Sequence, residues 1–398
     1  MRLNLGVIFG GKSVEHEISI ISAVEAMANI DTDKYKVIPI YIDKNNDWYT
    51  GDHLKSILHY RDIALVKRYA KKVSLVKRGK TFVLESQGFL KRNLFVIDMV
   101  LPIGHGSFVE DGSLQGYLNM LGVPFVGSSV LASAIGQDKV IQKDLFKQNN
   151  IPVCNYVWFY DHEFEKNKNE VMNKIKKLSY PLYVKPASLG SSIGISVAND
   201  EKELVKSIKD AIKFDRKVIV EEKVKNVKEI NISVLGNYEK QSVSEIEEIN
   251  TNDEFYSFKE KYVEGYSKTK GKEKTNKSKP LISKEMIEDM KAYAIKVFNT
   301  VNASGVARVD FLIDDKDKKL YVNEINTIPG DLSSYLWMAK KMSQKELINH
   351  LIDLAVAEQI KKDSTVYAFP GNLLEHYDIL KGEKLNKPDR DSKEENEK

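Results

Sequence analysis

The sequence predicts an α/β fold whose first domain holds a parallel sheet, followed by an α+β part. Strand-like runs at residues 3–9, 36–42 and 94–101 alternate with helix-like segments near the start, as in βαβ units. Further along, residues 305–326 read as two strands joined by a polar turn. With 398 residues, 42% of them hydrophobic, the chain can form two or three domains with substantial cores.

Composition points to a cytoplasmic protein that binds neither nucleic acid nor membrane. The 61 basic and 57 acidic side chains nearly balance, so the charge does not call for a nucleic-acid partner. No stretch is apolar for long enough to cross a bilayer, and glycine interrupts the N-terminal apolar run too early for a signal peptide. The only cysteine, Cys154, excludes an internal disulfide and fits a reducing compartment.

The remaining predicted elements follow in chain order. Residues 123–129 read as a short strand and turn, and a helix is expected from about 129 to 148. Residues 54–80 mix basic and apolar side chains and allow no firm assignment. Pro152 opens the next block, and the expected later elements are strands at 182–185, 218–221, 229–235 and 242–249 and a helix at 283–300.

These elements suggest four segments: 1–138, 139–222, 223–360 and a tail at 361–398, the end of which is too charged to form a core. Residues 266–280 contain six lysines and no apolar side chain beyond Tyr266. We expect a mobile loop there. It would either close over phosphates or form a solvated excursion, and the second reading suits most of its lysines better.

The hairpin at residues 305–326 carries a candidate metal site. Asp310 lies on the first strand, and Glu324 and Asn326 lie two residues apart on the second, so the three side chains can share one face. Carboxylate and amide oxygens with room for water suit Mg²⁺ bound together with phosphates. The alternative is a solvated acidic hairpin.

A literal match to the phosphate-loop pattern GxxxxGK[ST] occurs at residues 6–13, and residues 94–98 resemble its usual companion strand. In a true phosphate loop, however, the first glycine follows the strand. Here Val7, Ile8 and Phe9 read as strand residues themselves, so the match lacks its structural context.

The segment after this strand is more informative. Gly10 and Gly11 allow a ligand to approach the backbone closely, and Glu15 precedes a helix with apolar Ile18, Ile21, Val24 and Met27. Glu15 is placed to neutralise a substrate ammonium group. An acidic residue that merely complements the helix dipole is an equally good explanation.

Residues 183–194 predict a phosphate-binding loop. A strand delivers Lys185, and the small residues that follow, among them Gly190 and Ser191, offer backbone N–H groups and hydroxyls. A generic glycine turn is the alternative. Farther along, Glu222 and Glu229 are candidates for contacts to adenine and ribose, although charged residues at strand ends are common.

Six segments together resemble the D-alanine–D-alanine ligases of the ATP-grasp superfamily. The resemblance covers residues 6 to about 357, and its most specific pieces are GGKSVEHEIS, HGSFVEDGSLQG, VKPASLGSSIG, KEKY, ARVDF and NEINTIPG. All six occur in the family's order. The resemblance implies a three-domain ATP-grasp architecture.

The resemblance also implies roles for individual residues. Lys139, Lys185 and Lys261 would bind ATP phosphates, with Glu222 near adenine and Glu229 at the ribose. Asp310, Glu324 and Asn326 would hold two Mg²⁺ or Mn²⁺ ions. Glu15 would bind the ammonium of the first D-alanine, Ser191 and Tyr262 would orient it, and Arg308 and the N–H of Gly330 would stabilise the oxyanion.

The implied activity joins two D-alanines through an acyl phosphate, with ATP as co-substrate, for peptidoglycan synthesis by a cytoplasmic homodimer. The lid, from residue 256 into the lysine-rich stretch, would exclude water. The sequence departs from the family after Gly330: where the family has a serine for the second substrate's carboxylate, this chain has Tyr335, preceded by Ser333 and Ser334. This leaves open D-serine or D-lactate as the second substrate, or another dipeptide ligase. By the family's pattern, Tyr262 would favour an amino acid over a hydroxy acid. A catalytically silent nucleotide-binding protein is disfavoured by the intact Arg308, Asp310, Glu324 and Asn326.

Overall fold

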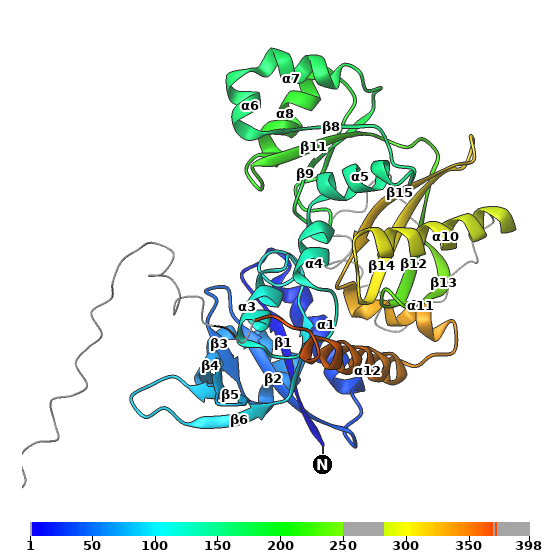
Figure 1. Cartoon of the computed structure of the whole chain (residues 1–398). Helices are drawn as coiled ribbons and strands as arrows, with labels where there is room; N and C mark the ends of the chain where they lie inside the picture. The colour runs from blue at the N-terminus through cyan, green and yellow to red at the C-terminus, as the bar shows by residue number, and fades with distance from the viewer. Residues whose placement is uncertain (1, 250–281, 369–370, 372–398) are drawn as a thin grey trace, which may run out of the picture. The chain divides into compact units, whose positions relative to one another are not determined.

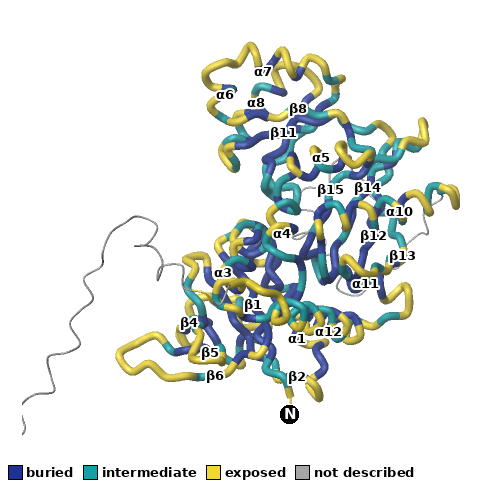
Figure 2. Tube along the Cα trace, in the orientation of Figure 1, coloured by how far each residue is buried: buried dark blue, intermediate teal, exposed yellow. Residues whose placement is uncertain are grey.

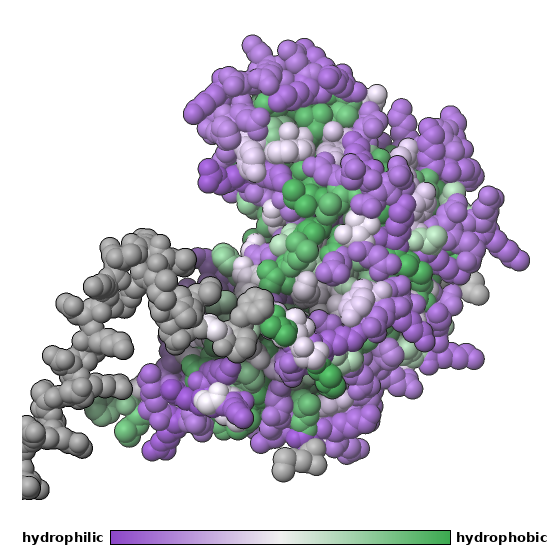
Figure 3. Space-filling model, viewed as in Figure 1, coloured by the Kyte–Doolittle hydropathy of each residue, from purple (hydrophilic) through white to green (hydrophobic). Residues whose placement is uncertain are grey.

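The computed structural model describes residues 2–249, 282–368 and 371. The chain divides into two units, Met1–Ala357 and Glu358–Lys398, and the three sheets belong to the first. Within the described ranges, no helix is both long and apolar enough to span a membrane. The face seen in Figure 3 is largely hydrophilic, with hydrophobic side chains gathered near its middle.

The first sheet has seven strands in the order β6-β5-β4-β3-β2-β1-β7 (Figure 1). The predicted parallel pairing holds for β1 with β2 and with β7. The other four strands extend the sheet by antiparallel pairing, so the sheet is mixed. The strands are β1 (Leu3–Gly10), β2 (Tyr35–Ile42), β3 (Trp48–Thr50), β4 (Lys71–Arg78), β5 (Thr81–Ser86), β6 (Asn93–Ile97) and β7 (Met99–Ile103).

Two sequence interpretations of this region need correction. The single strand expected at residues 94–101 is two strands, because Asp98 turns the chain and its carboxylate accepts a 2.7 Å hydrogen bond from the Asn4 backbone N–H. The unassigned residues 54–80 hold short helices and most of β4. These helices are η1 (Asp52–Lys55), η2 (Ile57–Arg61) and α2 (Ile63–Tyr69).

Both faces of β1 are buried (Figure 2). Val7 and Phe9 belong to one hydrophobic cluster and Ile8 to another, as expected for a strand covered on both sides. Helix α1 (His16–Asn29) packs beside β1. Of its predicted apolar stripe, Ile18 and Met27 are buried. Another helix, α3 (Ser113–Leu121), follows β7.

The helix predicted from about 129 to 148 is two helices, α4 (Val130–Gln137) and α5 (Lys139–Gln148). Asp138 lies between them in an extended conformation, and its carboxylate accepts hydrogen bonds from the N–H groups of Val140 and Ile141. This is an N-cap, which starts a new helix rather than continuing the first.

The second sheet is antiparallel, in the order β10-β9-β11-β8, and three helices pack beside it (Figure 1). Buried apolar side chains from both layers, such as Phe159 and Leu204, form one cluster. The elements are β8 (Tyr156–Tyr160), β9 (Leu182–Pro186), β10 (Ser196–Ala198), β11 (Lys217–Glu222), α6 (Asp161–Lys166), α7 (Lys168–Ile175) and α8 (Glu201–Ala211).

The third sheet is also antiparallel, in the order β13-β12-β14-β15, with helix α10 packed against it. Short helices follow β15 and lead to the long helix α12. The elements are β12 (Val227–Gly236), β13 (Gln241–Ile249), α10 (Lys284–Thr300), β14 (Gly305–Asp314), β15 (Lys319–Asn326), η4 (Gly330–Ser333), α11 (Ser334–Met338) and α12 (Gln344–Asp363).

Candidate active site

A polar cavity of about 100 Å³ collects residues from parts of the chain that are far apart in sequence. Seven of the predicted site residues line it, and they come from the start of α1, from α5, from the loop after β9 and from the β14–β15 hairpin with the turn that follows. They are Glu15, Lys139, Ser191, Arg308, Glu324, Asn326 and Gly330.

The β14–β15 hairpin aligns the predicted metal ligands by means of a bulge. Asp310 pairs directly with Glu324, whereas the next residue, Phe311, pairs with Val322, so Asn323 is an extra residue in β15. The Asn326 amide donates a 3.2 Å hydrogen bond to the Asp310 carboxylate. The three side chains therefore share one face, as the sequence predicts, and a bulge is a usual device for redirecting a side chain beside a site.

Both carboxylates of this hairpin lie against cations. The guanidinium of Arg308 donates two hydrogen bonds to Asp310, of 2.6 and 2.8 Å, and Lys139 Nζ lies 3.3 Å from Glu324 Oε2. Burial would raise the pKa of Glu324, but the positive charges of Lys139, Lys185 and Arg308 outweigh it and hold that pKa at about 2. Glu324 is therefore ionised and can accept a metal ion.

Lys185 is buried beside a carboxylate that the sequence reading missed. Its Nζ donates a 2.6 Å hydrogen bond to Glu221, and Lys143 Nζ lies 3.2 Å from the other oxygen of the same carboxylate. Burial opposes the charged form of Glu221, yet the two lysines lower its pKa to about 2. The sequence held one indication of this role. Glu221 and Glu222 are neighbours in β11, and neighbouring residues of a strand face opposite sides, so one of the two carboxylates had to face away from the other.

Glu15 and Ser191 meet across the cavity although 175 residues separate them in the chain. The Ser191 hydroxyl donates a hydrogen bond to the Glu15 carboxylate. A Cβ placed on Gly190 would lie 2.9 Å from Glu15 Oε2, so a larger residue at this position would displace the Glu15 carboxylate. The structure thus brings together the two residues predicted to handle the ammonium of the first substrate.

His105 and Glu110 also line the cavity, and no role was predicted for either. Burial lowers the pKa of His105 to about 4, and its ring lies 3.0 Å from the Ser22 hydroxyl. Burial, with the nearby charge of Glu15, raises the pKa of Glu110 to about 8. Both residues belong to the HGSFVEDGSLQG segment, so the motif located them without indicating what they do.

Other predicted residues lie elsewhere. The Glu222 carboxylate accepts 2.9 Å hydrogen bonds from the Asn155 amide and the Ser179 backbone, and Glu229 lies in β12 opposite Leu312. Neither lines the cavity. Ser333 and Ser334 are buried and Tyr335 is half-buried just beyond Gly330. Lys261, Tyr262, the expected lid and the lysine-rich loop fall outside the described residues.

The phosphate-loop match fails in the structure as expected. Gly6 lies inside β1 and pairs with Ile38 of β2 and Val100 of β7, so the residues that would form the loop are strand.

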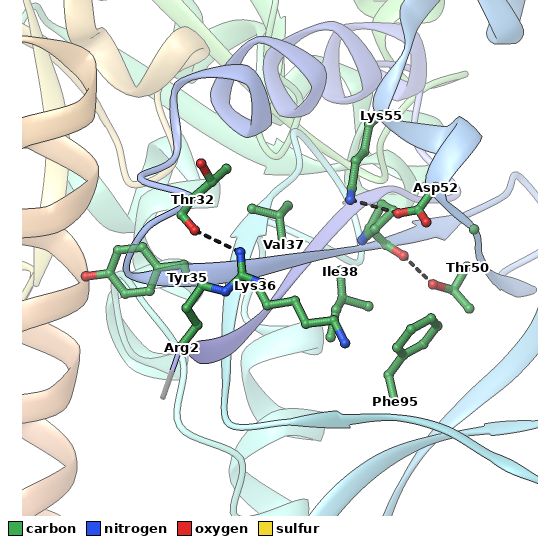
Figure 4. Close-up of a pocket in the computed structure, with 12 residues that line it drawn as sticks. Arg2, Thr32, Tyr35, Lys36, Val37, Ile38, Thr50, Asp52, Lys55 and Phe95 are labelled. Atoms are coloured by element: carbon green, nitrogen blue, oxygen red, sulfur yellow. Dashed lines mark hydrogen bonds and ion pairs between the residues drawn. The ribbon is translucent and has the colours of Figure 1, made fainter.

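A second cavity, of about 210 Å³, is larger but chemically less suited to catalysis (Figure 4). It lies on the first sheet, where Arg2 donates a hydrogen bond to the Thr32 carbonyl and Lys55 pairs with Asp52. None of the described residues predicted for the site lines it. The smaller cavity remains the candidate active site because seven of the predicted site residues line it, among them Glu15, Lys139 and Glu324.

The hairpin fits a divalent metal ion by the chemistry of its donors. Asp310, Glu324 and Asn326 offer only oxygen ligands on one face, as Mg²⁺ requires. Among the described residues there is no group of three His, Cys, Asp or Glu side chains with metal-binding geometry. The candidate metal ligands are two carboxylates and one amide, and substrate oxygens would complete the coordination of the ion.

The comparisons agree with this geometry. Residues 4–128 match the family model described as D-ala D-ala ligase N-terminus, and residues 145–353 match the D-ala D-ala ligase C-terminus. A D-alanine--D-alanine ligase of Thermosipho melanesiensis is 38% identical over 373 residues, which cover 94% of this chain and 98% of the relative.

Solved structures show the same fold. The D-alanine-D-alanine ligase of Coxiella burnetii superimposes with a TM-score of 0.76 at 28% identity, over 96% of this chain and 99% of that one. The VanG D-Ala:D-Ser ligase of Enterococcus faecalis gives 0.74 at 29% identity, over 89% and 100%. Fold and site together define an ATP-grasp ligase. Within that class, the chain belongs to the D-alanine–D-alanine ligase family.

Proposed function

We propose that this protein joins two D-alanine molecules into D-alanyl-D-alanine, with conversion of ATP to ADP and phosphate, as a step of peptidoglycan precursor synthesis. The observation that carries the proposal is the single cavity lined by Glu15, Ser191, Lys139, Arg308 and Glu324. It combines an ammonium-binding carboxylate with the charges that phosphoryl transfer needs. Family membership supports both the reaction and the use of ATP.

The reaction begins with the carboxylate of the first D-alanine. An amine attacks a carboxylate too slowly, so a carboxylate oxygen first attacks the γ-phosphorus of ATP, forming an acyl phosphate and releasing ADP. Lys139 and Lys185 neutralise the phosphates. Asp310, Glu324 and Asn326 would hold two Mg²⁺ or Mn²⁺ ions, and these ions would neutralise further charge on the transferred phosphoryl group.

The substrate is oriented from the opposite side of the cavity. The Glu15 carboxylate, held by the Ser191 hydroxyl, pairs with the ammonium of the first D-alanine. The second D-alanine attacks with its neutral amine, the carbonyl oxygen becomes negative, and Arg308 with the N–H of Gly330 stabilises that charge. The C–N bond forms in this attack. The tetrahedral intermediate then passes a proton from its nitrogen to the departing phosphate, and expulsion of that phosphate restores the C=O double bond of the peptide.

The second substrate is the main alternative within the family. Asp331, Leu332 and Ser333 have left-handed backbone angles, with φ between 51° and 53°, just where the sequence departs from the family. One structural match is a D-Ala:D-Ser ligase. We therefore keep D-serine as the second candidate, and D-lactate because the departure after Gly330 leaves it open as well.

The deciding experiment measures phosphate release and identifies the product by mass spectrometry. Purified protein, ATP and Mg²⁺ are incubated with D-alanine alone, then with D-alanine plus D-serine or D-lactate. The proposal expects D-alanyl-D-alanine from D-alanine alone. If D-alanyl-D-alanine is absent and a product of D-alanine with D-serine or D-lactate forms instead, the protein is a ligase for that second substrate.

The same proposal includes a cytoplasmic homodimer. Cytoplasmic ATP and D-alanine are the substrates, and the resemblance to a usually dimeric family supports the dimer. Light scattering on the eluting peak of a sizing column is expected to give twice the 45.4 kDa chain mass. A peak at the monomer mass at micromolar concentration would reject the dimer without touching the reaction.

A further inference from the structure

Lys143 is a buried lysine that neither lines the cavity nor was predicted to act in the site. Only 1% of its surface is exposed, and lysine is almost never buried this deeply unless it is paired. Its ammonium has two partners: the Glu221 carboxylate at 3.2 Å and the Asn323 carbonyl at 3.1 Å. Each partner adjoins a different predicted site residue: Glu221 accepts a hydrogen bond from Lys185, and Asn323 directly precedes Glu324.

The contact to Asn323 holds the bulge that aims Glu324. If the register of Phe311 with Val322 continued unbroken, Asp310 would face Asn323 and Glu324 would face the buried Val309. The extra residue instead puts Glu324 beside Asp310. Lys143 donates to the backbone at the point where the ladder is interrupted.

Helix α5 supports the same stretch of β15, which is the edge strand of its sheet. The Gln142 side chain accepts a 3.0 Å hydrogen bond from the Ile325 N–H and lies 3.4 Å from the Ile325 carbonyl. Consecutive residues of α5 therefore bind the bulged backbone, with the charged one placed directly at the bulge.

The contact to Glu221 reaches the nucleotide side. The other oxygen of this carboxylate accepts the 2.6 Å hydrogen bond from Lys185, which the proposed function assigns to ATP phosphate. A chain of buried charged groups thus runs from the metal-binding hairpin through Lys143 and Glu221 to Lys185.

We infer that Lys143 is a positioning residue that couples metal binding to nucleotide binding, by holding the bulge under Glu324 and the carboxylate that orients Lys185. This inference rests on the proposed function for the roles of Glu324 and Lys185. Without the Lys143 charge, Glu221 retains only Lys185 as an ion-pair partner, and the bulged stretch of β15 retains only the contacts of Gln142. Mg²⁺ should then strengthen nucleotide binding less than in the wild-type protein.

The test measures ADP binding by calorimetry, once in Mg²⁺ and once in EDTA, for wild type and Lys143→Met. Methionine keeps the length of the side chain and removes the charge. The matched control is Lys217→Met, because Lys217 of β11 is also buried and forms a 2.8 Å ion pair with Asp138, the N-cap of α5. This ion pair involves neither Glu221 nor β15. Circular dichroism and thermal melting accompany each variant.

We expect the ratio of the two ADP dissociation constants to fall by about tenfold in Lys143→Met and to change less than about threefold in Lys217→Met. An unchanged ratio in a folded Lys143→Met protein would overturn the inference. If that variant does not fold, the isosteric Glu221→Gln removes the same ion pair, and an unchanged ratio there has the same meaning. D-alanine is absent from this assay, so the ligation reaction tests the proposed function separately.

Discussion

Lys139 and Glu324, from a helix of one part of the chain and an edge strand of another, form an ion pair of 3.3 Å inside the cavity. Lys139 also donates a 2.6 Å hydrogen bond to the Leu189 carbonyl, in the loop after β9. One ammonium group thus connects the predicted phosphate loop to the predicted metal ligands. A phosphate would bind Lys139 and a metal ion would bind Glu324. Either event therefore changes the ion pair between these two residues.

The role of Glu324 is tested with Glu324→Gln, which keeps the shape and removes the charge. We expect turnover to fall at least about a hundredfold, because changes outside the ligand shell already cost ten- to a hundredfold. Exposed Glu288→Gln on α10 is the control. Chelation of divalent ions by EDTA should abolish the wild-type rate, and added Mg²⁺ should restore it. Full activity of Glu324→Gln at saturating Mg²⁺ would exclude Glu324 as an essential ligand.

Substitution of two lysines distinguishes an ATP-grasp nucleotide site from a phosphate loop at residues 6–13. Lys185→Ala removes a buried cation beside Glu221 that the proposed function assigns to an ATP phosphate. We expect ATP binding to weaken by about a hundredfold or more, because truncating one partner of a buried charge pair across an interface is this costly. Lys12→Ala, at an exposed position, should leave ATP binding within about twofold. Equilibrium binding of a fluorescent ATP analogue measures both, and the reverse outcome would favour the phosphate loop.

Glu15→Gln tests recognition of the first substrate. Without the negative charge, the ammonium of D-alanine loses its ionic partner in a largely enclosed site. The KM for the first D-alanine should rise by about tenfold or more, while the KM for ATP stays nearly constant. Glu17→Gln, an exposed change two residues away, serves as the control. Equal changes in both KM values would indicate a general disturbance of the site.

Stability of the third sheet depends on Phe298, which is fully buried between α10 and the strands. Phe298→Ala should lower the free energy of unfolding by about 3–5 kcal/mol through lost burial and the cavity left behind. Phe89→Ala is the control, because Phe89 is fully exposed and its removal should change stability by less than about 0.5 kcal/mol. Urea unfolding followed by circular dichroism compares the two.

Glu110 predicts a pH dependence of the ligand-free protein. Burial, with the charge of Glu15, raises its pKa to about 8 in the folded chain, above the ordinary value near 4.5. Its stabilising contribution is therefore complete below about pH 4.5 and is lost as the pH rises towards 8.

The corresponding variant is Glu110→Gln, whose neutral amide cannot ionise. Between about pH 6 and 8 the free energy of unfolding of the wild type should fall more steeply than that of the variant, by up to about 1.4 kcal/mol per pH unit. Melting curves recorded at each pH show this as a steeper fall in the melting temperature. Glu288→Gln should keep the wild-type slope. Parallel slopes for wild type and Glu110→Gln would show that Glu110 does not titrate in this range.

Local patterns predicted the β14–β15 hairpin, the helix at α10 and the strand at β1, because each combines a clear period with capping or turn residues. They did not reveal that Asp98 and Asp138 interrupt apparent single elements. Each aspartate makes hydrogen bonds that change the chain direction, and such contacts depend on residues that only the fold brings near.

The residues of the site that lie in the six motifs were predictable from the sequence. Glu15 and Ser191 meet as the resemblance implied. The pair Lys143–Glu221 was not foreseen, because nothing in the sequence distinguishes a buried lysine of a helix from an exposed one. One pattern in the sequence reflects the bulge. Val322 and Ile325 are apolar and both buried although they are three residues apart, whereas residues on one face of a regular strand are two apart.

The composition of the cavity also constrains how the protein is made. Glu15 is synthesised well before Gly330, and both line the cavity. Domains generally fold as units during synthesis, from the N-terminus onwards. The first two sheets can therefore form early, but no nascent chain that ends before Gly330 contains the complete site. Ligand binding can protect only a chain that has passed Gly330, so the earlier stages depend on the hydrophobic clusters of the separate sheets.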